Sequence, residues 1–255
     1  MKIENCLESE VKLECGLKIN GKEFKNIIVR EVVGYDEEAI SQPKFKKNAS
    51  GLIIELISRC IAEIPGAERF PSQQELKDLP IGILDTLTLA IRKVTVGDDI
   101  EIKAFCPGFL EDAQGNRKPC KKPYEALISI NDIEIKKGAY VPIEVILSRG
   151  IVYEGKVLKK ATLRLVDGNV QETFLKTTDF TKFGELSTEF IFKCVIDIDG
   201  VIPTEDMVRS MSSKDRRKIT EALKNAPGPR TVHECICETC GEVWETPINI
   251  LDFLA

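Results

Sequence analysis

Apolar and polar residues alternate in two pairs of segments, each of which surrounds a short turn. The first pair covers 13–19 and 24–33 around Asn20-Gly21, and the second covers 145–153 and 157–166 around Glu154-Gly155-Lys156. Alternation predicts strands with one buried face, and Asn-Gly between two such runs is a strong hairpin signal. We therefore expect two β-hairpins whose turn glycines, Gly21 and Gly155, take positive φ.

An apolar segment follows each hairpin, at 50–60 and at 186–198. Both are apolar nearly all round, so periodicity alone leaves helix and buried strand open. Glu55 and Glu189 favour helix, whereas the β-branched residues after Cys194 favour strand there. Cys60 and Cys194 occupy equivalent places on these segments and are expected to be small buried core residues.

Helical spacing returns at 83–93 and at 213–224, with Gly97 and Gly228 expected as C-terminal caps. Strand-like segments then flank the cysteines in the last part of each repeat. These strands are expected at 100–105, 124–130, 230–236 and 242–248.

The chain also repeats itself. Shifted by 134 residues, 13–66 aligns with 147–200 without a gap, and fifteen of these 54 pairs are identical. Further along, a shift of 131 residues pairs Cys106 with Cys237. We therefore predict an α+β fold in which a unit of hairpin, helices and cysteine hairpin is duplicated, with domains at 13–130 and 141–255.

Composition indicates a soluble globular protein. The 255 residues are 43% apolar and 30% charged with a net charge of −5, which disfavours a dedicated duplex-binding protein. Neither a long apolar run nor a signal peptide is present, so a reducing cytosol is expected. There, the nine cysteines are better interpreted as metal ligands or buried thiols than as disulfides.

The cysteines form one pattern with metal-binding chemistry. Cys237-x-x-Cys240-Gly241 is a zinc-knuckle pattern, because two thiolates at this spacing can bind one tetrahedral ion. Cys106-Pro107 and Pro119-Cys120 are interpreted as the same knuckle with a loop inserted in it. The prediction is a closed structural zinc site of Cys106, Cys120, Cys237 and Cys240 that joins the two cysteine hairpins.

Two alternatives to this site stay open. A site within the second repeat would use His233 and Cys235 with Cys237 and Cys240, although these residues are crowded in sequence. The other alternative is that no metal binds and the thiols are buried or incidental.

Catalytic motifs are missing from the sequence. It contains no phosphate-binding loop, dinucleotide fingerprint or nucleophile elbow, and His233 is the only histidine. A further alternative is an enzyme with an acid site around Asp197 and Asp199, but a solvated strand end explains these residues more simply. We therefore expect no catalytic and no cofactor-binding residues, and a structural or binding role.

The order of features resembles the baseplate proteins of contractile-tailed bacteriophages, in particular the T-even-type baseplate hub or hub-assembly family. Arg30 stands in the strand before Gly34-Tyr35-Asp36-Glu37-Glu38, and an R-x-x-T-x-G helix end is formed by Arg92, Thr95 and Gly97. Cys106-Pro107, the later Cys237–Cys240 knuckle and an apolar C-terminus that contains Phe253 complete the resemblance.

This resemblance implies a structural or assembly protein of a phage tail baseplate hub, without catalysis, that binds other tail and baseplate proteins. It implies a place in the virion tail or in the host cytoplasm during assembly, with no membrane span and no small-molecule substrate. The alternative function is a zinc-ribbon nucleic-acid-binding module in which the basic loop 118–122 contacts phosphates.

Overall fold

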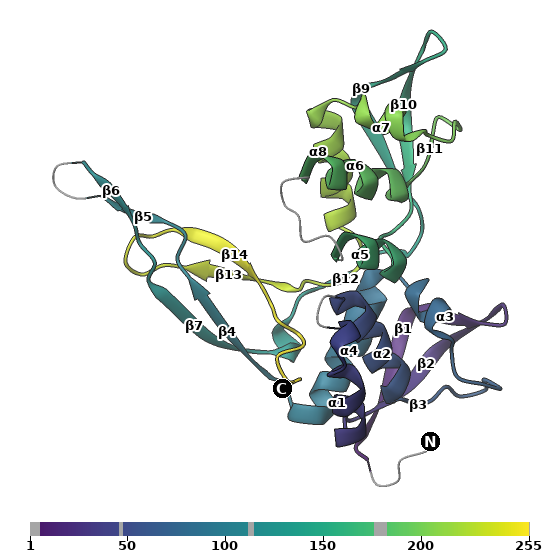
Figure 1. The fold of residues 1–255 in the computed structure, drawn as a ribbon, viewed down its shortest axis with the longest axis vertical. Helices are drawn as coiled ribbons and strands as arrows, with labels where there is room; N and C mark the ends of the chain where they lie inside the picture. The colour runs from purple at the N-terminus through teal and green to yellow at the C-terminus, as the bar shows by residue number, and fades with distance from the viewer. Residues whose placement is uncertain (1–5, 46–47, 112–114, 176–182, 255) are drawn as a thin grey trace.

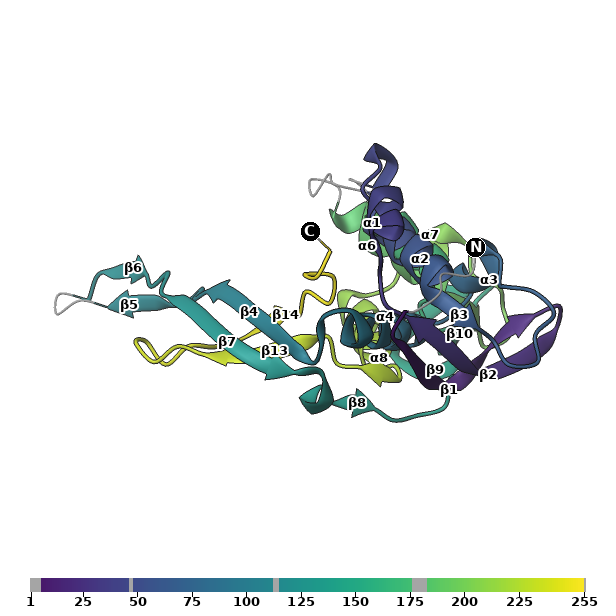
Figure 2. The ribbon, with the colours of Figure 1, turned by 90° about the horizontal axis from the view of Figure 1, so that it is seen from below.

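The computed structural model describes residues 6–45, 48–111, 115–175 and 183–254. Two α+β units form the body, and an arm built from strands of both halves of the chain projects from it (Figures 1 and 2). The fold class is therefore α+β, as predicted. Among the helices described, none has the length and apolar character needed to cross a bilayer.

The first unit begins with the predicted hairpin. Strands β1 (Glu8–Ile19) and β2 (Lys22–Arg30) pair antiparallel. The two turn residues Asn20 and Gly21 have φ values of 50° and 79°, as a two-residue turn of type I′ requires. Strand β3 (Ile61–Glu63) pairs with β2, so that the sheet order is β1-β2-β3.

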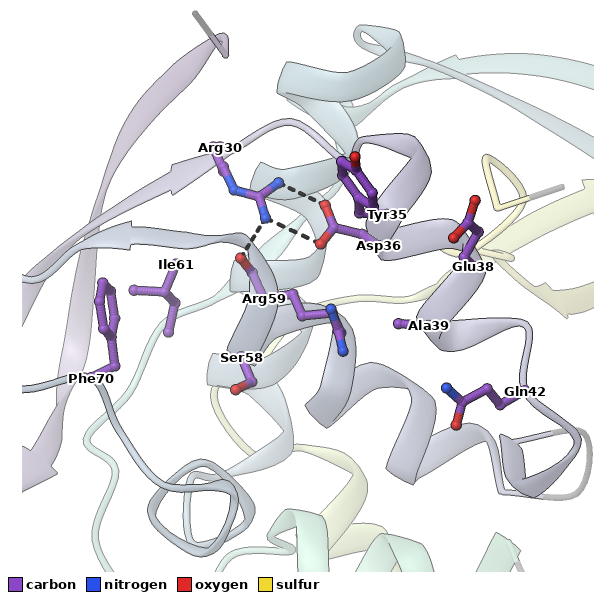
Figure 3. Close-up of a pocket in the computed structure, with 10 residues that line it drawn as sticks. All are labelled: Arg30, Tyr35, Asp36, Glu38, Ala39, Gln42, Ser58, Arg59, Ile61 and Phe70. Atoms are coloured by element: carbon purple, nitrogen blue, oxygen red, sulfur yellow. Dashed lines mark hydrogen bonds and ion pairs between the residues drawn. The ribbon is translucent and has the colours of Figure 1, made fainter. Parts of the chain in front are cut away.

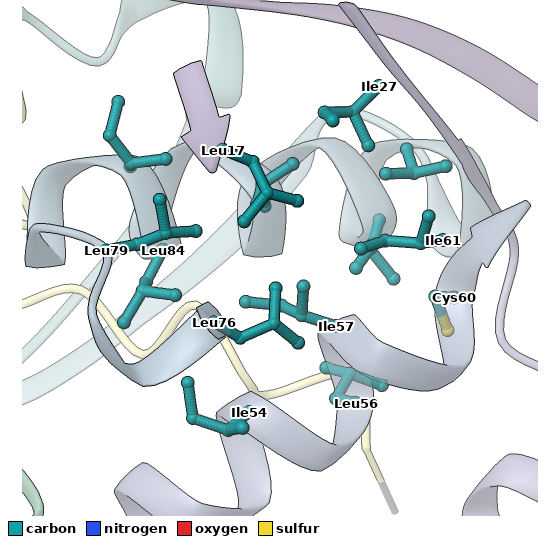
Figure 4. Packing of buried hydrophobic residues seen from close by; sticks show 14 of the residues in the cluster. Leu17, Ile27, Ile54, Leu56, Ile57, Cys60, Ile61, Leu76, Leu79 and Leu84 are labelled. Carbon is teal, nitrogen blue, oxygen red and sulfur yellow. The ribbon is translucent and has the colours of Figure 1, made fainter. Parts of the chain in front are cut away.

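Four helices complete this unit, and α4 lies against β1 and β2 while α2 packs on α4. Apolar side chains from the helices and the sheet meet in one core, part of which is drawn in Figure 4. Leu17, Ile57 and Leu87 in this core are fully buried. The helices are α1 (Gly34–Ile40), α2 (Ala49–Cys60), α3 (Gln73–Lys77) and α4 (Ile81–Val96), with a short 3₁₀ turn η1 (Pro43–Phe45) before α2.

The second unit has a sheet of the same kind. Strands β9 (Ile143–Tyr153) and β10 (Lys156–Leu163) form a hairpin around Glu154 and Gly155, whose φ values are 48° and 74°. Strand β11 (Val195–Ile198) pairs with β10, which again makes the second hairpin strand the central one. The helices of this unit are α5 (Gly168–Leu175), α6 (Phe183–Cys194), α7 (Glu205–Arg209) and α8 (Ser213–Lys224).

The two apolar segments for which the sequence left helix and buried strand open, 50–60 and 186–198, lead from a helix into a strand. Helix α2 ends at Cys60 and β3 begins at the next residue, and α6 ends at Cys194 where β11 begins. Both cysteines are fully buried, as predicted, and burial raises the pKa of each thiol to about 12. They are therefore core residues and not reactive thiols.

The two units share their order of elements: a hairpin, two helices, a third strand, two more helices and a strand pair. This shared order supports the duplication inferred from the sequence, which stays a prediction about the origin of the chain. The domain limits at 13–130 and 141–255 also stay a prediction.

The arm combines strands from both halves. Strands β4 (Asp99–Phe105) and β7 (Pro123–Ser129) form one pair, and β13 (Val232–Ile236) and β14 (Val243–Pro247) form the other. A small apolar core that includes Ile100, Ile102 and Ile248 lies between them. The remaining short elements are β5 (Phe109–Glu111), β6 (Arg117–Pro119), η2 (Ile130–Asp132), β8 (Ile135–Lys136) and β12 (Gly228–Pro229).

One of the two predicted helix caps is wrong. Gly97 does end α4, with a φ of 92° and its N–H donated to the Lys93 carbonyl. Helix α8, however, ends at Lys224 with Asn225 as its cap, and Gly228 lies in β12, where it pairs with Lys136 of β8. Glycine is needed at position 228 for another reason, which is the close approach of β12 to the start of α4.

Gly228 and Gly82 touch through their backbones. A Cβ on Gly82 would overlap the Pro227 carbonyl oxygen, and one on Gly228 would overlap the Cα of Gly82. Gly228 also has a φ of 134°. Glycine at both positions therefore lets the start of α4 lie directly against β12.

The apolar C-terminus docks on the first unit. Leu251, Phe253 and Leu254 pack against its core, and Ala255 lies outside the described residues. Asp252 accepts a hydrogen bond from Arg92 Nε at 3.0 Å, and the Arg92 side chain is only 4% exposed. Apolar contacts and an ion pair thus both hold this segment against the first unit.

We expect Gly82→Ala to destabilise the protein by about 1–3 kcal/mol, because the new methyl group overlaps backbone atoms that cannot move independently. Gly184→Ala is the matched control, since Gly184 is also the second residue of its helix but has no atom of the described residues close to where its new methyl group would lie. The control is expected to be neutral or slightly stabilising. Urea unfolding measures both, and equal effects of the two substitutions would refute the tight contact.

Candidate metal centre

Four cysteines meet where the two strand pairs of the arm end. Cys106 directly follows β4, and Cys120 lies three residues before β7. Cys237 directly follows β13, and Cys240 lies in the turn that leads to β14. These are the four residues predicted from the sequence, and the fold brings all of them together.

Their sulfur atoms all lie within 4.8 Å of one another. The Sγ atoms of Cys106 and Cys240 are 3.4 Å apart, and those of Cys120 and Cys237 are 3.8 Å apart. Four sulfurs around one tetrahedral zinc ion, at Zn–S distances of about 2.3 Å, would be separated by about 3.8 Å. Cys106 and Cys237 are buried and the other two are half-buried, so the protein encloses most of the cluster. All four are free thiols.

The two knuckles have the same local backbone geometry. The N–H of Cys106 donates to the Lys122 carbonyl, and the N–H of Cys237 donates to the Glu242 carbonyl, each at 2.9 Å. The residue after the second cysteine of each knuckle has positive φ: 51° at Lys121 and 74° at Gly241. The long insertion after Cys106 thus leaves the knuckle geometry unchanged.

Backbone groups and burial act on these thiols in opposite directions. The N–H groups of Cys240 and Thr239 favour the thiolate of Cys237 and lower its pKa to about 6. Burial raises the pKa of Cys106 to about 12, although the N–H of Gly108, 3.4 Å from its sulfur, opposes this. Without a cation the cluster therefore holds at least one thiol in the neutral form, and a metal ion would displace its proton.

His233 and Cys235 are not part of the cluster. His233 Nε2 lies 3.0 Å from the hydroxyl of Tyr124, across the arm. The sulfur of Cys235 is buried beside the carbonyl of His233. In the parts of the chain that the structure describes, the four cysteines are the only group of three or more ligand side chains close enough for one metal ion.

The acidic pair has structural partners. Asp197 accepts the N–H of Gly200 at 2.9 Å, and Asp199 accepts the N–H of Lys159 at 2.5 Å. Both carboxylates thus hold the tight turn after β11, where Asp199 and Gly200 have positive φ. This observation favours the solvated strand end over an acid site.

A groove of about 790 Å³ that sequence reasoning missed lies between α1, α2 and β3 (Figure 3). At its base Arg30 makes two hydrogen bonds to Asp36, at 2.7 and 3.1 Å, and a third to the Arg59 carbonyl. Tyr35 and Phe70 line the groove with most of their surface exposed. The motif around Arg30 and Asp36 was recognised in sequence, but nothing in its spacing predicts a buried ion pair.

The other motif residues also hold the fold together. Arg92 donates to the carbonyls of Gly97 and Asp99 as well as to Asp252, and thereby joins the end of α4 to β4 and to the C-terminus. Thr95 accepts the N–H of Val32 at 3.0 Å. The residues on which the resemblance to baseplate proteins rests thus largely stabilise the fold.

These features define an α+β protein with a cysteine-bearing arm. The family model described as "T4 bacteriophage base plate protein" matches residues 8–255. The chain belongs to this family, and the family places it in the tail of a bacteriophage virion. Comparisons with curated proteins and with solved structures gave no match.

The buried ion pair leads to a stability prediction. Arg30→Met is expected to cost about 3–5 kcal/mol, because it leaves Asp36 as a buried carboxylate without its cation. The side chains of Arg30 and Asp36 are 8% and 3% exposed. Arg209→Met is the control, because Arg209 pairs with Glu205 and Asp206 on the surface, and it is expected to cost less than about 1 kcal/mol. Chemical unfolding that finds Arg30→Met as mild as the control would contradict this.

Proposed function

We propose that the protein is a structural or assembly component of the baseplate hub that acts through protein–protein contacts and carries one structural zinc ion in the arm. Family membership supports the baseplate. The hub, the zinc ion and the absence of enzymatic activity are our inferences. The single observation that carries the proposal is the projecting arm, with four thiols gathered at the end of its strand pairs.

The donor set fits zinc. Four thiolates prefer a soft or borderline metal ion, and a tetrahedral set of four sulfurs is typical of structural zinc and of iron–sulfur centres. With four protein ligands no position is left for water or substrate, so the ion would stabilise the structure and not catalyse a reaction. Its benefit would be greatest in the arm, whose own apolar core is small.

Apolar side chains around the cysteines support contact with another protein. Phe105 and Phe109 are 72% and 58% exposed, and Ile236 and Val243 lie exposed opposite each other on β13 and β14. Large exposed apolar groups clustered at one site are typical of protein interaction surfaces. They lie next to the metal centre, so the ion would also fix the surface that a tail protein contacts.

Exposed basic residues favour the alternative, a zinc-ribbon module that binds nucleic acid. Lys118, Lys121 and Lys122 are exposed near the cysteines. Acidic residues share this part of the arm, however: Arg117 pairs with Glu111, and Glu238 and Glu242 are exposed. Binding to DNA or RNA that weakens steeply with salt would support this alternative.

The metal site predicts that Cys240→Ser removes zinc binding and lowers the melting temperature. Native mass spectrometry is expected to find one zinc ion per wild-type chain, lost on chelation and absent in the variant. Cys15→Ser is the matched control, because Cys15 is also half-buried but lies outside the cluster, and it should keep the ion. A folded wild-type protein without zinc, with all its cluster thiols open to alkylation, would exclude the metal centre.

The hub assignment predicts a defect in particle assembly. Phage in which this gene carries a nonsense mutation should accumulate incomplete baseplates without a central hub, visible by electron microscopy, in a host that does not suppress the mutation. Wild-type protein supplied from a plasmid should restore tails. Complete baseplates in the mutant would exclude the hub role and leave the metal site unaffected.

A further inference from the structure

A second cavity, of about 440 Å³, lies between the two units of the body. Its walls come from the start of α4, the segment after β10, helices α5, α6 and α8, and the segment that leads into β12. Most of this lining is apolar and includes Ile81, Leu165, Val166, Phe190, Leu223 and Pro227. The cavity therefore suits a hydrocarbon chain.

One carboxylate, Asp85 of α4, lines this cavity. It is half-buried, and it has no hydrogen bond or ion pair with any residue that the structure describes. The buried carboxylates elsewhere differ: Asp36 pairs with Arg30, and Asp215 accepts the N–H groups of Arg149 and Gly150. Asp85 is thus an acid placed in apolar surroundings without a partner from its own chain.

The surroundings of Asp85 make its charge costly. Burial raises the pKa of Asp85 to about 7, against an ordinary value of 3.8. Lys224 of α8 lines the same cavity without forming an ion pair with Asp85, and the nearby Tyr140 phenol, whose own pKa is raised to about 12, stays neutral. A cation that enters the cavity would restore the favourable interaction that the ionised carboxylate loses on leaving water.

Lysine fits this combination better than arginine. Its four methylenes can pack along apolar walls while a compact ammonium group reaches a single carboxylate. A guanidinium group has five N–H donors in a planar fork and would leave several of them unpaired in an apolar cavity. A baseplate protein works among other proteins, which supports a side chain as the source of the ammonium group and not a free amine.

We propose that the cavity between the two units binds a lysine side chain of a partner protein, with the ammonium group paired to Asp85 and the methylenes packed on the apolar walls. The proposal goes beyond the hub and zinc assignments and depends on neither of them. Because both units line the cavity, a bound lysine would also hold them together.

The test compares two ligands that differ only in the ammonium group. At pH 8, capped lysine (N-acetyl-lysine methylamide) is expected to bind the full-length protein at least tenfold more tightly than capped norleucine, as measured by NMR titration. Asp85→Asn should remove this difference. Asp206→Asn, a change at an exposed aspartate that does not line the cavity, should keep it.

The pH dependence gives a second readout on the wild-type protein. Because the lysine ammonium needs the ionised carboxylate, its affinity should fall as the pH drops below 7, by up to about tenfold per pH unit, while norleucine is unaffected. Because it uses the wild-type protein, this measurement tests the pairing of the ammonium group with Asp85 even if Asp85→Asn does not fold.

Three results would overturn the proposal. They are equal binding of lysine and norleucine, no binding of either, and an unchanged preference for lysine in Asp85→Asn. Hexylammonium that binds where capped lysine does not would show that the cavity takes a free amine, and would exclude the partner lysine. Loss of zinc in Cys240→Ser would leave all these results unchanged, so the two proposals fail separately.

Discussion

Helix α4 is buried on several sides, and each side faces a different part of the chain. Ile83, Leu87 and Ile91 lie in the core of the first unit, whereas Leu89 lies in the core of the arm. Gly82 touches the segment that leads to β13, and Arg92 holds the C-terminus. A helix that is apolar on most of its surface belongs inside a protein, and here it is the common support of both units and the arm.

Sequence reasoning succeeded where the signal was local. Asn20-Gly21 predicts its turn because few residues adopt positive φ, and the Cys-x-x-Cys-Gly pattern predicts a knuckle because its chemistry depends on short spacing. It failed for Gly228, because a glycine near a helix end fits a cap as well as a close contact. The Arg30–Asp36 pair and the Asp85 cavity were missed because burial arises from tertiary packing, which spacing does not encode.

The two units have similar elements but different surfaces. Ile146, Val152 and Val157 are exposed on the hairpin of the second unit. At a shift of 134 residues, their counterparts in the first unit are Lys12, Lys18 and Glu23. At these positions the hairpin of the second unit thus exposes apolar side chains where that of the first unit has charged ones, so the two units present different surfaces.

The arm is built from two segments that lie far apart in the sequence, and this separation determines when the arm can form during synthesis. Cys106 and Cys120 leave the ribosome more than one hundred residues before Cys237 and Cys240, so neither the cysteine cluster nor the apolar core shared by the two strand pairs can be complete before the second pair emerges. Contacts this distant in sequence form late in folding. The finished arm therefore forms only after translation has passed residue 240, and a chain that ends before Cys237 lacks two of the four clustered thiols.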